Sequence, residues 1–316
     1  IADLNHERDR LVDFCIEHNI QMLRGGEVQL LDNNKSIRNH IKPIDIEDLL
    51  YREEIQMDIE AVSHQMSGKV ILVTGAAGSI GREIASQLAH LDVRRLVLLD
   101  CAETPLHDLE LELRKAFPDK NIAFVLSDVR SRARMKAVFE HYRPEFVFHA
   151  AAYKHVPMVE ANPCEGVMTN IWGTVNTANH AVRYGAEKFV MISTDKAINP
   201  TNVMGASKRI AELCVQGFNA DGSGTQFIIT RFGNVLGSNG SVIPLFREQI
   251  ARGGPVTVTH PEMIRYFMTI SEACRLVLQA ATMGSGGEIY VFDMGQQVKI
   301  DNLARRMILL SGLVPD

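Results

Sequence analysis

Val70-Ile-Leu-Val-Thr-Gly-Ala-Ala-Gly-Ser-Ile-Gly81 is the segment from which the rest of the architecture can be predicted. Four apolar residues lead into a turn with three glycines, Gly75, Gly78 and Gly81, and residues 82–89 then have apolar side chains at helical spacing. Glycine permits a sharp turn and lets the backbone approach a pyrophosphate, which would bind N–H groups at the helix start, near Ser79 and Ile80. The segment therefore predicts a strand, a tight turn and a helix that bind a nucleotide.

An acidic residue follows the next predicted strand, residues 95–99. Asp100 lies about 20 residues beyond the last glycine of the turn, where a carboxylate can accept hydrogen bonds from an adenosine ribose. This favours NAD, because an NADP enzyme usually has an arginine just after this strand, and Cys101-Ala-Glu-Thr104 has none. Arg82 and Arg130 could still reach a 2′-phosphate, so NADP stays an alternative.

The composition is typical of a globular protein without a polyanionic partner. Of the 316 residues, 46% are hydrophobic and 22% are charged, and the formal net charge of -5 gives no sign of a nucleic-acid-binding surface. The five cysteines are scattered, so the sequence predicts no metal site and no disulfide framework, and it indicates a reducing compartment such as the cytoplasm. The sequence has no apolar run of about 18 residues, the length that a transmembrane helix needs.

From residue 69 onward, apolar strands alternate with helical segments. The predicted strands are 70–74, 95–99, 122–126, 146–149, 188–193, 226–231 and 288–292, and the predicted helices include 82–90, 106–117, 132–142, 165–184 and 207–220. This alternation indicates an α/β fold with a doubly wound parallel sheet. Glycines and prolines break the chain after residue 233, which indicates a smaller C-terminal substrate lobe.

The sequence thus predicts three divisions, which are a linker or docking segment (1–66), a Rossmann domain (67–233) and the lobe (234–316), the last intermixed with the Rossmann domain. Within the first division we expect an amphipathic helix over 4–23, a short strand over 27–32 and a helical stretch over 53–63.

Two further segments at strand ends are candidates for cofactor binding. Asp128-Val129 follows the third strand, where a carboxylate can accept a hydrogen bond from an adenine amino group, and a helix N-cap is the equal alternative. In His149-Ala-Ala-Ala-Tyr-Lys-His155, the small side chains of Ala150 and Ala151 would let the backbone approach a flat cofactor. Lys154 would project near the pocket, unless it is only a solvated surface lysine.

Ser193-Thr-Asp-Lys196, at the end of the fifth strand, is the strongest candidate for chemistry. Thr194, Asp195 and Lys196 supply a hydroxyl, a carboxylate and an ammonium group on consecutive residues at the sheet edge where ligands bind. A desolvated Lys196 could act as a base at neutral pH, and Asp195 could act as an acid. The alternative is that Asp195 and Lys196 only form a surface ion pair.

Residues 69–316 resemble the extended short-chain dehydrogenase/reductase family. The resemblance rests on Thr74-Gly-Ala-Ala-Gly-Ser-Ile-Gly81, Asp128-Val129, His149-Ala-Ala-Ala152 and Ser193-Thr-Asp-Lys196. Within this family the chain is similar to the large UDP-N-acetylglucosamine 4,6-dehydratases of bacterial polysaccharide synthesis, through Tyr153-Lys-His-Val-Pro157, Asp195-Lys-Ala-Ile-Asn-Pro-Thr-Asn202, Met204-Gly-Ala-Ser-Lys208 and Arg231-Phe-Gly-Asn-Val-Leu-Gly-Ser-Asn-Gly240.

One position departs from the family's usual Tyr-x-x-x-Lys pair. Met204 stands where the tyrosine would be, while Lys208 is retained. Methionine has no proton to exchange, so a simple carbonyl reductase with this residue should be badly impaired. The large dehydratases resemble this chain in having methionine there, and in that group the methionine form is associated with retention at C5.

The resemblance implies an NAD-dependent lyase that oxidises C4 of the sugar, eliminates water across C5 and C6, and reduces C6. Lys196 would be the base at C5, Asp195 the acid for the departing C6 hydroxyl, and Thr194 a hydrogen-bond partner of the C4 oxygen. Lys208 would hold the nicotinamide ribose. The acceptor of the C4 hydroxyl proton is left open between Asp195 and water relayed through Thr194.

The resemblance also implies a substrate and partners. The substrate would be UDP-N-acetylglucosamine or a close UDP-hexose, contacted by Lys154, Asn234, Ser241, Val242, Arg247, Thr257 and Arg265. A homo-oligomer would pair through the helices near 165–184 and 207–220. Full-length members carry an N-terminal membrane region, so the parent would lie on the cytoplasmic face of the bacterial inner membrane. They also continue beyond residue 315 with a segment that helps close the lobe.

Two other functions compete with the dehydratase. A UDP-sugar 4-epimerase of the same fold would need a proton shuttle at position 204 and no elimination apparatus. A nucleotide-sensing module that has lost its chemistry is supported by Met204 alone, and the retained Asp195, Lys196 and Lys208 speak against it.

Overall fold

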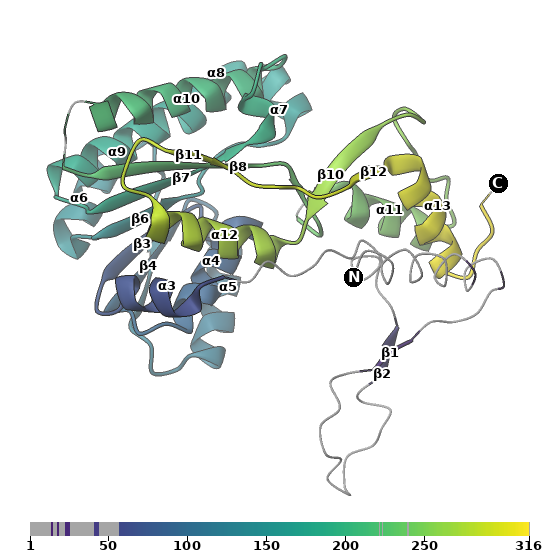
Figure 1. Cartoon of the computed structure of the whole chain (residues 1–316), viewed down its shortest axis with the longest axis horizontal. Coiled ribbons are helices and arrows are strands. Elements are labelled where there is room, and N and C mark those ends of the chain that lie inside the picture. The colour runs from purple at the N-terminus through teal and green to yellow at the C-terminus, as the bar shows by residue number, and fades with distance from the viewer. Residues whose placement is uncertain are drawn as a thin grey trace, which may run out of the picture. The chain divides into compact units, whose positions relative to one another are not determined.

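The computed structural model describes residues 57–220, 222, 224–238 and 240–315, together with Phe14, His18 and residues 23–25 and 41–43. The chain divides into two compact units, shown in the ribbon of Figure 1. The larger unit comprises Glu54–Gly240 and Met268–Met294, and the smaller unit includes Ser241–Phe267 and Gly295–Asp316.

A seven-stranded sheet with the order β11-β8-β7-β6-β3-β4-β5 forms the centre of the larger unit (Figure 1). Every neighbouring pair of strands in it is parallel. The strands are β3 (Val70–Thr74), β4 (Arg95–Asp100), β5 (Ile122–Leu126), β6 (Phe146–His149), β7 (Lys188–Thr194), β8 (Gln226–Phe232) and β11 (Ile289–Val291). The predicted doubly wound parallel sheet is confirmed.

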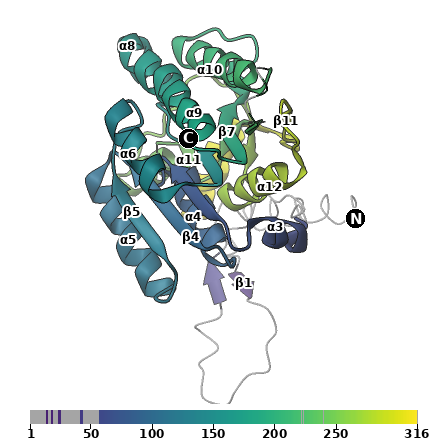
Figure 2. The ribbon, with the colours of Figure 1, turned by 90° about the vertical axis from the view of Figure 1, so that its left-hand side faces the viewer.

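Helices cover both faces of this sheet (Figure 2). Along β3, Ile71 and Val73 join one buried cluster with α3, α4, α5 and α12, while Val70 and Leu72 join the other with α6, α9 and α10. Alternate side chains of a strand point to opposite faces, so an unbroken apolar strand needs cover on both sides. The helices are α3 (Ile59–Met66), α4 (Ser79–Ala89), α5 (Glu103–Ala116), α6 (Arg132–Tyr142), α9 (Gly173–Arg183), α10 (Val203–Ala220) and α12 (Ile270–Met283).

The helix predicted over 165–184 is interrupted in the structure. It begins as α8 (Pro163–Gly166), widens into a π-helical turn, η2 (Val167–Trp172), and continues as α9. A further short helix, α7 (Val156–Ala161), precedes it. Such π-turns are rare and are often found at functional sites.

The glycine turn after β3 leaves no room for larger side chains. Gly75 has a φ of +68°, and a Cβ there would lie 2.6 Å from the backbone nitrogen of Ala151. A Cβ on Gly81 would lie 2.1 Å from the carbonyl oxygen of Gly75. The turn therefore packs directly against the segment that follows β6.

The observed units differ in extent from the predicted divisions, most of all at residues 268–294. The sequence assigned this segment to the lobe, but it belongs to the larger unit, because α12 packs against α4 and β11 pairs with β8. The smaller unit contains α11 (Val242–Ala251), which packs on α13 (Ile300–Leu310), and β12 (Gln297–Lys299), which pairs antiparallel with β10 (Ile264–Met268).

The first division of the chain is described only in part. An antiparallel pair, β1 (Leu23–Gly25) and β2 (Ile41–Pro43), was not predicted. Apart from Phe14, His18 and residue 23, the helix predicted over 4–23 lies outside the described residues, as does the strand predicted over 27–32. Among the described residues, we find no helix long and apolar enough to cross a membrane.

Candidate active site

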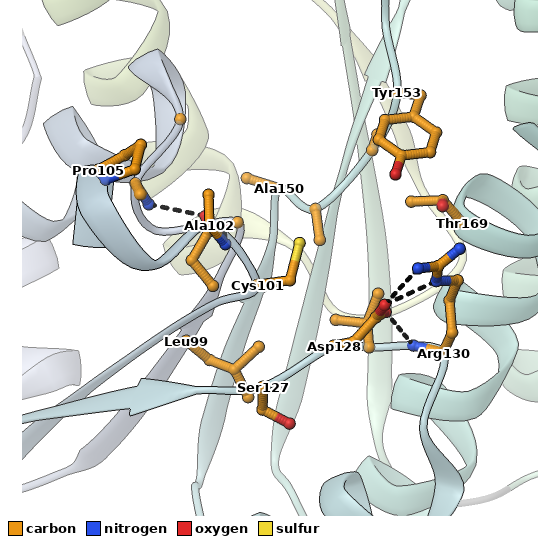
Figure 3. Close-up of a pocket in the computed structure, with 17 residues that line it drawn as sticks. Leu99, Cys101, Ala102, Pro105, Ser127, Asp128, Arg130, Ala150, Tyr153 and Thr169 are labelled. Carbon is orange, nitrogen blue, oxygen red and sulfur yellow. Dashed lines mark hydrogen bonds and ion pairs between the residues drawn. The ribbon is translucent and has the colours of Figure 1, made fainter. Parts of the chain in front are cut away.

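A pocket of about 350 Å³ opens at the carboxyl ends of the strands of the larger unit (Figure 3). The strand order reverses between β3 and β6, because the chain continues from β3 toward one side of the sheet and from β6 toward the other. The pocket lies at this point. This is the place where doubly wound sheets bind ligands. The lining residues are Gly75, Ala77, Gly78, Leu99, Asp100, Cys101, Ala102, Pro105, Ser127, Asp128, Val129, Arg130, Ala150, Ala151, Ala152, Tyr153 and Thr169.

Asp100 is held rigidly at the wall of this pocket. Its Oδ2 accepts a hydrogen bond from the N–H of Ala77 at 2.9 Å, and its Oδ1 accepts one from the N–H of Ala102 at 2.9 Å. Each carboxylate oxygen retains a second lone pair for a ligand hydroxyl. Ser79 and Ile80 are the first residues of α4, where helical N–H groups point out of the helix end.

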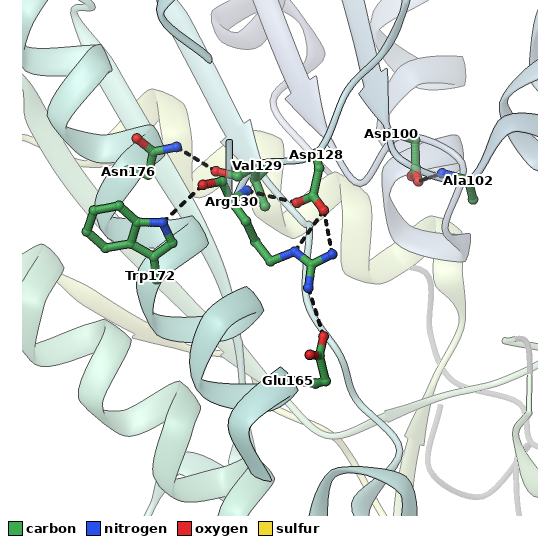
Figure 4. Close-up of polar contacts among 8 residues, drawn as sticks. All are labelled: Asp100, Ala102, Asp128, Val129, Arg130, Glu165, Trp172 and Asn176. Carbon is green, nitrogen blue, oxygen red and sulfur yellow. Dashed lines mark hydrogen bonds and ion pairs between the residues drawn. The ribbon is translucent and has the colours of Figure 1, made fainter. Parts of the chain in front are cut away.

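Asp128 forms an ion pair at the opposite wall and does not cap a helix (Figure 4). Its Oδ2 lies 2.6 Å from Nη2 of Arg130, and the N-cap of α6 is Ser131, so the N-cap alternative for Asp128 is wrong. Burial alone would raise the pKa of Asp128, but the hydrogen bonds and the charge of Arg130 outweigh it and lower this pKa. Asp128 is thus an ionised acceptor facing the pocket.

The segment after β6 is fixed by buried hydrogen bonds. The N–H of Tyr153 donates to Oδ1 of Asn170 at 2.8 Å, and Nδ2 of Asn170 donates to the carbonyl of Tyr153 at 3.0 Å and to Oγ of Ser207 at 2.9 Å. His149 is buried between the hydroxyls of Thr74 and Thr174, and burial, aided by the charge of Lys208, lowers its pKa to about 3. His149 is therefore a neutral structural residue.

Lys154 follows this clamped backbone directly. Its side chain is exposed at the surface, yet the surrounding protein lowers its pKa by desolvation. Ala150 and Ala151 line the pocket.

Thr194, Asp195 and Lys196 form one hydrogen-bonded cluster with Asn234. Nζ of Lys196 lies 3.0 Å from Oδ1 of Asp195 and donates to Oδ1 of Asn234 at 3.1 Å. Oγ1 of Thr194 donates to Oδ1 of Asp195 at 2.9 Å. The ion pair expected as the alternative does form and is partly exposed, but it is shared with a hydroxyl and an amide, which a simple surface pair lacks.

Lys208 and Met204 are both buried on α10. Nζ of Lys208 donates to the carbonyl oxygen of Ile192 at 2.7 Å. Ile192 precedes, by two residues, the hydrogen-bonded group of Thr194, Asp195, Lys196 and Asn234, which we call the Thr194 cluster. Burial lowers the pKa of Lys208 to about 8, although the charge of Glu212 acts in the opposite direction.

This buried lysine predicts a pH-dependent contribution to stability. Lys208 loses its proton near pH 8 in the folded protein but near 10.5 in an unfolded chain, so the unfolded state binds more protons in that window. The free energy of unfolding should therefore rise by about 3 kcal/mol from this group across the window. Urea unfolding of wild type and Lys208→Met at several pH values should give curves that diverge there; parallel curves would contradict the prediction.

The remaining substrate-side candidates belong to different units. Asn234 lies in the larger unit, whereas Ser241, Val242, Arg247, Thr257 and Arg265 lie in the smaller one. Ser241 and Val242 stand at the start of α11, and the N–H of Thr257 donates to Oε1 of Gln249 at 3.0 Å. Arg247 and Arg265 are exposed.

Three polar groups in or near this site were not predicted from the sequence. In the described part of the chain, the hydroxyls of Ser127 and Thr169 are buried without a hydrogen-bond partner, and both residues line the pocket. Glu212 is fully buried, and accepts hydrogen bonds from Ser193 at 2.6 Å and from Nε of Arg231 at 2.8 Å. The only sequence signal for Glu212 was its place one helical turn after Lys208.

A family model described as polysaccharide biosynthesis protein matches residues 71–316. The chain belongs to this family. The match includes the glycine turn, the pocket and the Thr194 cluster.

Curated relatives of this family member include capsular and nucleotide-sugar proteins. The capsular polysaccharide biosynthesis protein CapD of Staphylococcus aureus is 50% identical over 93% of this chain and 48% of its own length, so the chain spans about half of that relative. The UDP-N-acetylglucosamine 4,6-dehydratase (inverting) of Campylobacter jejuni subsp. jejuni serotype O:23/36 is 34% identical over 76% of the chain and 71% of its own. The UDP-glucose 4-epimerase of Rickettsia rickettsii is 35% identical over 71% and 65%.

Solved structures share the fold. Pen from Bacillus thuringiensis is 34% identical, with a TM-score of 0.73 over 78% of this chain and 75% of its own. DesIV, a dTDP-glucose 4,6-dehydratase from Streptomyces venezuelae solved with NAD bound, has a TM-score of 0.69 at 23% identity over 77% and 81%. This family member therefore shares the doubly wound fold of these solved structures.

Proposed function

We propose that the chain catalyses the NAD-dependent 4,6-dehydration of UDP-N-acetylglucosamine to a UDP-linked 4-keto-6-deoxy sugar. The observation that supports it best is the cluster of Thr194, Asp195, Lys196 and Asn234 at the edge of the sheet. It brings an acid, a base and a hydroxyl within hydrogen-bonding distance of one another. An elimination needs both an acid and a base beside the sugar, whereas a simple hydride transfer needs only one group that exchanges the hydroxyl proton.

The residues of the pocket fit a nicotinamide dinucleotide. The glycine turn admits close approach of a pyrophosphate, Asp100 can accept from ribose hydroxyls, and the unpartnered hydroxyls of Ser127 and Thr169 can bind the ligand. Arg82 pairs with Glu112 and Arg130 with Asp128, so the charge of each guanidinium is already balanced by a carboxylate that would repel a 2′-phosphate. We therefore propose NAD rather than NADP. When bound, its nicotinamide would accept hydride from C4 and return it to C6.

The hydrogen bonds suggest where each proton goes. The C4 hydroxyl proton would pass through Thr194 to Asp195, because Oγ1 of Thr194 already donates to that carboxylate. Protonated Asp195 would then give this proton to the departing C6 hydroxyl. Lys196 would take the C5 proton and return it to C5 after C6 is reduced. Buried Met204 then needs no acid–base role, and Lys208 would hold the nicotinamide ribose.

Mass spectrometry of the protein incubated with UDP-N-acetylglucosamine and NAD, without added reductant, tests this proposal. A product lighter by one water molecule, with no net consumption of NAD, is the expected result. A product of unchanged mass with the galacto configuration would establish an epimerase, the activity of the Rickettsia relative. Binding of NAD without any turnover of sugar would favour a binding module.

We also propose that the chain self-associates through η2 and α10, which pack together. Each presents exposed apolar side chains, among them Val167 and Met168 on η2 and Ile210 and Leu213 on α10. Leu213→Arg should place a charge in this contact and lower the mass measured by light scattering to that of a monomer. Leu111→Arg is the control, because Leu111 is exposed to a similar extent on α5. A wild type that is already monomeric would contradict the proposal.

A further inference from the structure

The carboxylate of Asp128 accepts hydrogen bonds from both the backbone and the side chain of Arg130. Oδ1 accepts the backbone N–H of Arg130 at 2.8 Å, and Oδ2 accepts Nε–H of the same residue at 2.7 Å and lies 2.6 Å from its Nη2. A carboxylate oxygen offers two acceptor positions. Oδ2 is therefore fully used, and Oδ1 keeps one position for a group in the pocket.

Arg130 is in turn held from its far side (Figure 4). Its Nη1 donates to Oε2 of Glu165 at 2.8 Å, so the guanidinium lies between two carboxylates. The indole N–H of Trp172 donates to the carbonyl of Arg130 at 3.0 Å, and Nδ2 of the buried Asn176 donates to the carbonyl of Val129 at 2.7 Å. Both the backbone and the side chain of Arg130 are therefore fixed by the helical segment that carries η2.

We infer that Arg130, braced by Glu165, makes the pocket selective for a dinucleotide whose base presents an amino group, and selective against one that presents a carbonyl oxygen. The inference rests on the proposed dinucleotide function. Asp128 cannot donate a hydrogen bond, and Arg130 prevents its carboxylate from turning away. An adenine amino group would donate to Oδ1, whereas the carbonyl oxygen of hypoxanthine would meet a fixed carboxylate and repel it.

Arg130 and Glu165 are positioning residues in this arrangement, and their effects should be graded. Without Arg130 the carboxylate can rotate into water, which relieves the repulsion of a carbonyl and weakens the hold on an amino group. Glu165 is about half exposed, with a side-chain exposure of 55%, so its loss should leave Arg130 tethered by Asp128 alone and have a smaller effect.

Calorimetric titration with NAD and with nicotinamide hypoxanthine dinucleotide tests the inference. The readout is the ratio of the two dissociation constants. A general loss of structure would weaken the binding of both dinucleotides alike and would leave this ratio unchanged. For wild type we expect a preference for NAD of about 10- to 100-fold. Arg130→Met should reduce this ratio to below about fivefold, and Glu165→Gln should give an intermediate ratio. Glu110→Gln, which breaks the exposed ion pair with Arg114 on α5, is the matched control and should leave the ratio unchanged.

The outcomes separate this inference from the proposed function. Tight binding of NAD with a wild-type ratio near one would overturn the inference alone, and would mean that an N–H of Arg130 donates a hydrogen bond to the carbonyl oxygen of hypoxanthine. An unchanged ratio in Arg130→Met would overturn it as well. Failure of wild type to bind either dinucleotide would overturn the proposed cofactor and the inference together. The emission of Trp172, the single tryptophan of the chain, offers a second readout because its indole contacts Arg130.

Discussion

Replacing Lys196 with alanine should lower the turnover of UDP-N-acetylglucosamine by about 10²- to 10⁴-fold, the usual contribution of a general base. In the proposed mechanism Lys196 takes the C5 proton. Its hydrogen-bond partners, Asp195 and Asn234, remain in the variant but cannot replace the amine as the base at C5. The binding of NAD should be unchanged, because Lys196 does not line the pocket. The stability should change little, because a partly exposed ion pair contributes at most about 1 kcal/mol.

Exchange of the C5 hydrogen in deuterated water gives a sharper test than turnover alone. Wild type should introduce deuterium at C5 of the product, and Lys196→Ala should abolish this exchange. Lys115→Ala, an exposed lysine in the last turn of α5, controls for the loss of one positive charge. If Lys196→Ala keeps its rate within a few-fold of wild type, another group must be the base at C5.

The sheet was predictable because its strands leave a simple signal. All five residues of β3 are buried, so the sequence must be apolar without interruption, and the turn that follows must contain glycine. The order of strand and helix then limits the topology to a doubly wound sheet. The clustering of Thr194, Asp195 and Lys196 was predictable for the same reason, since they are consecutive and follow a buried strand.

The contacts across long sequence separations were not predictable. Glu165 reaches Arg130 from 35 positions away, and it does so from α8, directly before a π-turn that has no clear sequence signature. Asn234 reaches Lys196 across 38 positions for a similar reason. The sequence predicted that the lobe is intermixed with the Rossmann domain but not that residues 268–294 are the part involved. The helix α12 packs on α4, and amphipathic spacing shows only that one face of a helix is buried, not which element buries it.

Replacing Gly81 with alanine should have a second large effect. It should weaken NAD binding and lower the stability, whereas the loss of Lys196 should lower turnover. The added Cβ would lie 2.1 Å from the carbonyl oxygen of Gly75 and 2.8 Å from Cα of Ala76. Both contacts are with backbone atoms, which cannot rotate away as a flexible side chain can. The variant must therefore shift the whole turn to accommodate the added Cβ at the start of α4. Overpacking of this kind costs about 1–3 kcal/mol of stability, or more where the backbone cannot yield.

The displaced turn should also weaken the binding of NAD by about 100-fold or more, since a shift of 1 Å in a positioning element can have that effect. Gly217→Ala is the matched control, because a Cβ on that helical glycine of α10 meets nothing within 4 Å. It should stabilise the protein by up to about 1 kcal/mol through the helix preference of alanine, and leave NAD binding unchanged. Calorimetry and urea unfolding of both variants measure the two effects separately. Equal NAD affinity in Gly81→Ala and wild type would show that the pyrophosphate does not lie on this turn, because no bound phosphate could tolerate its displacement.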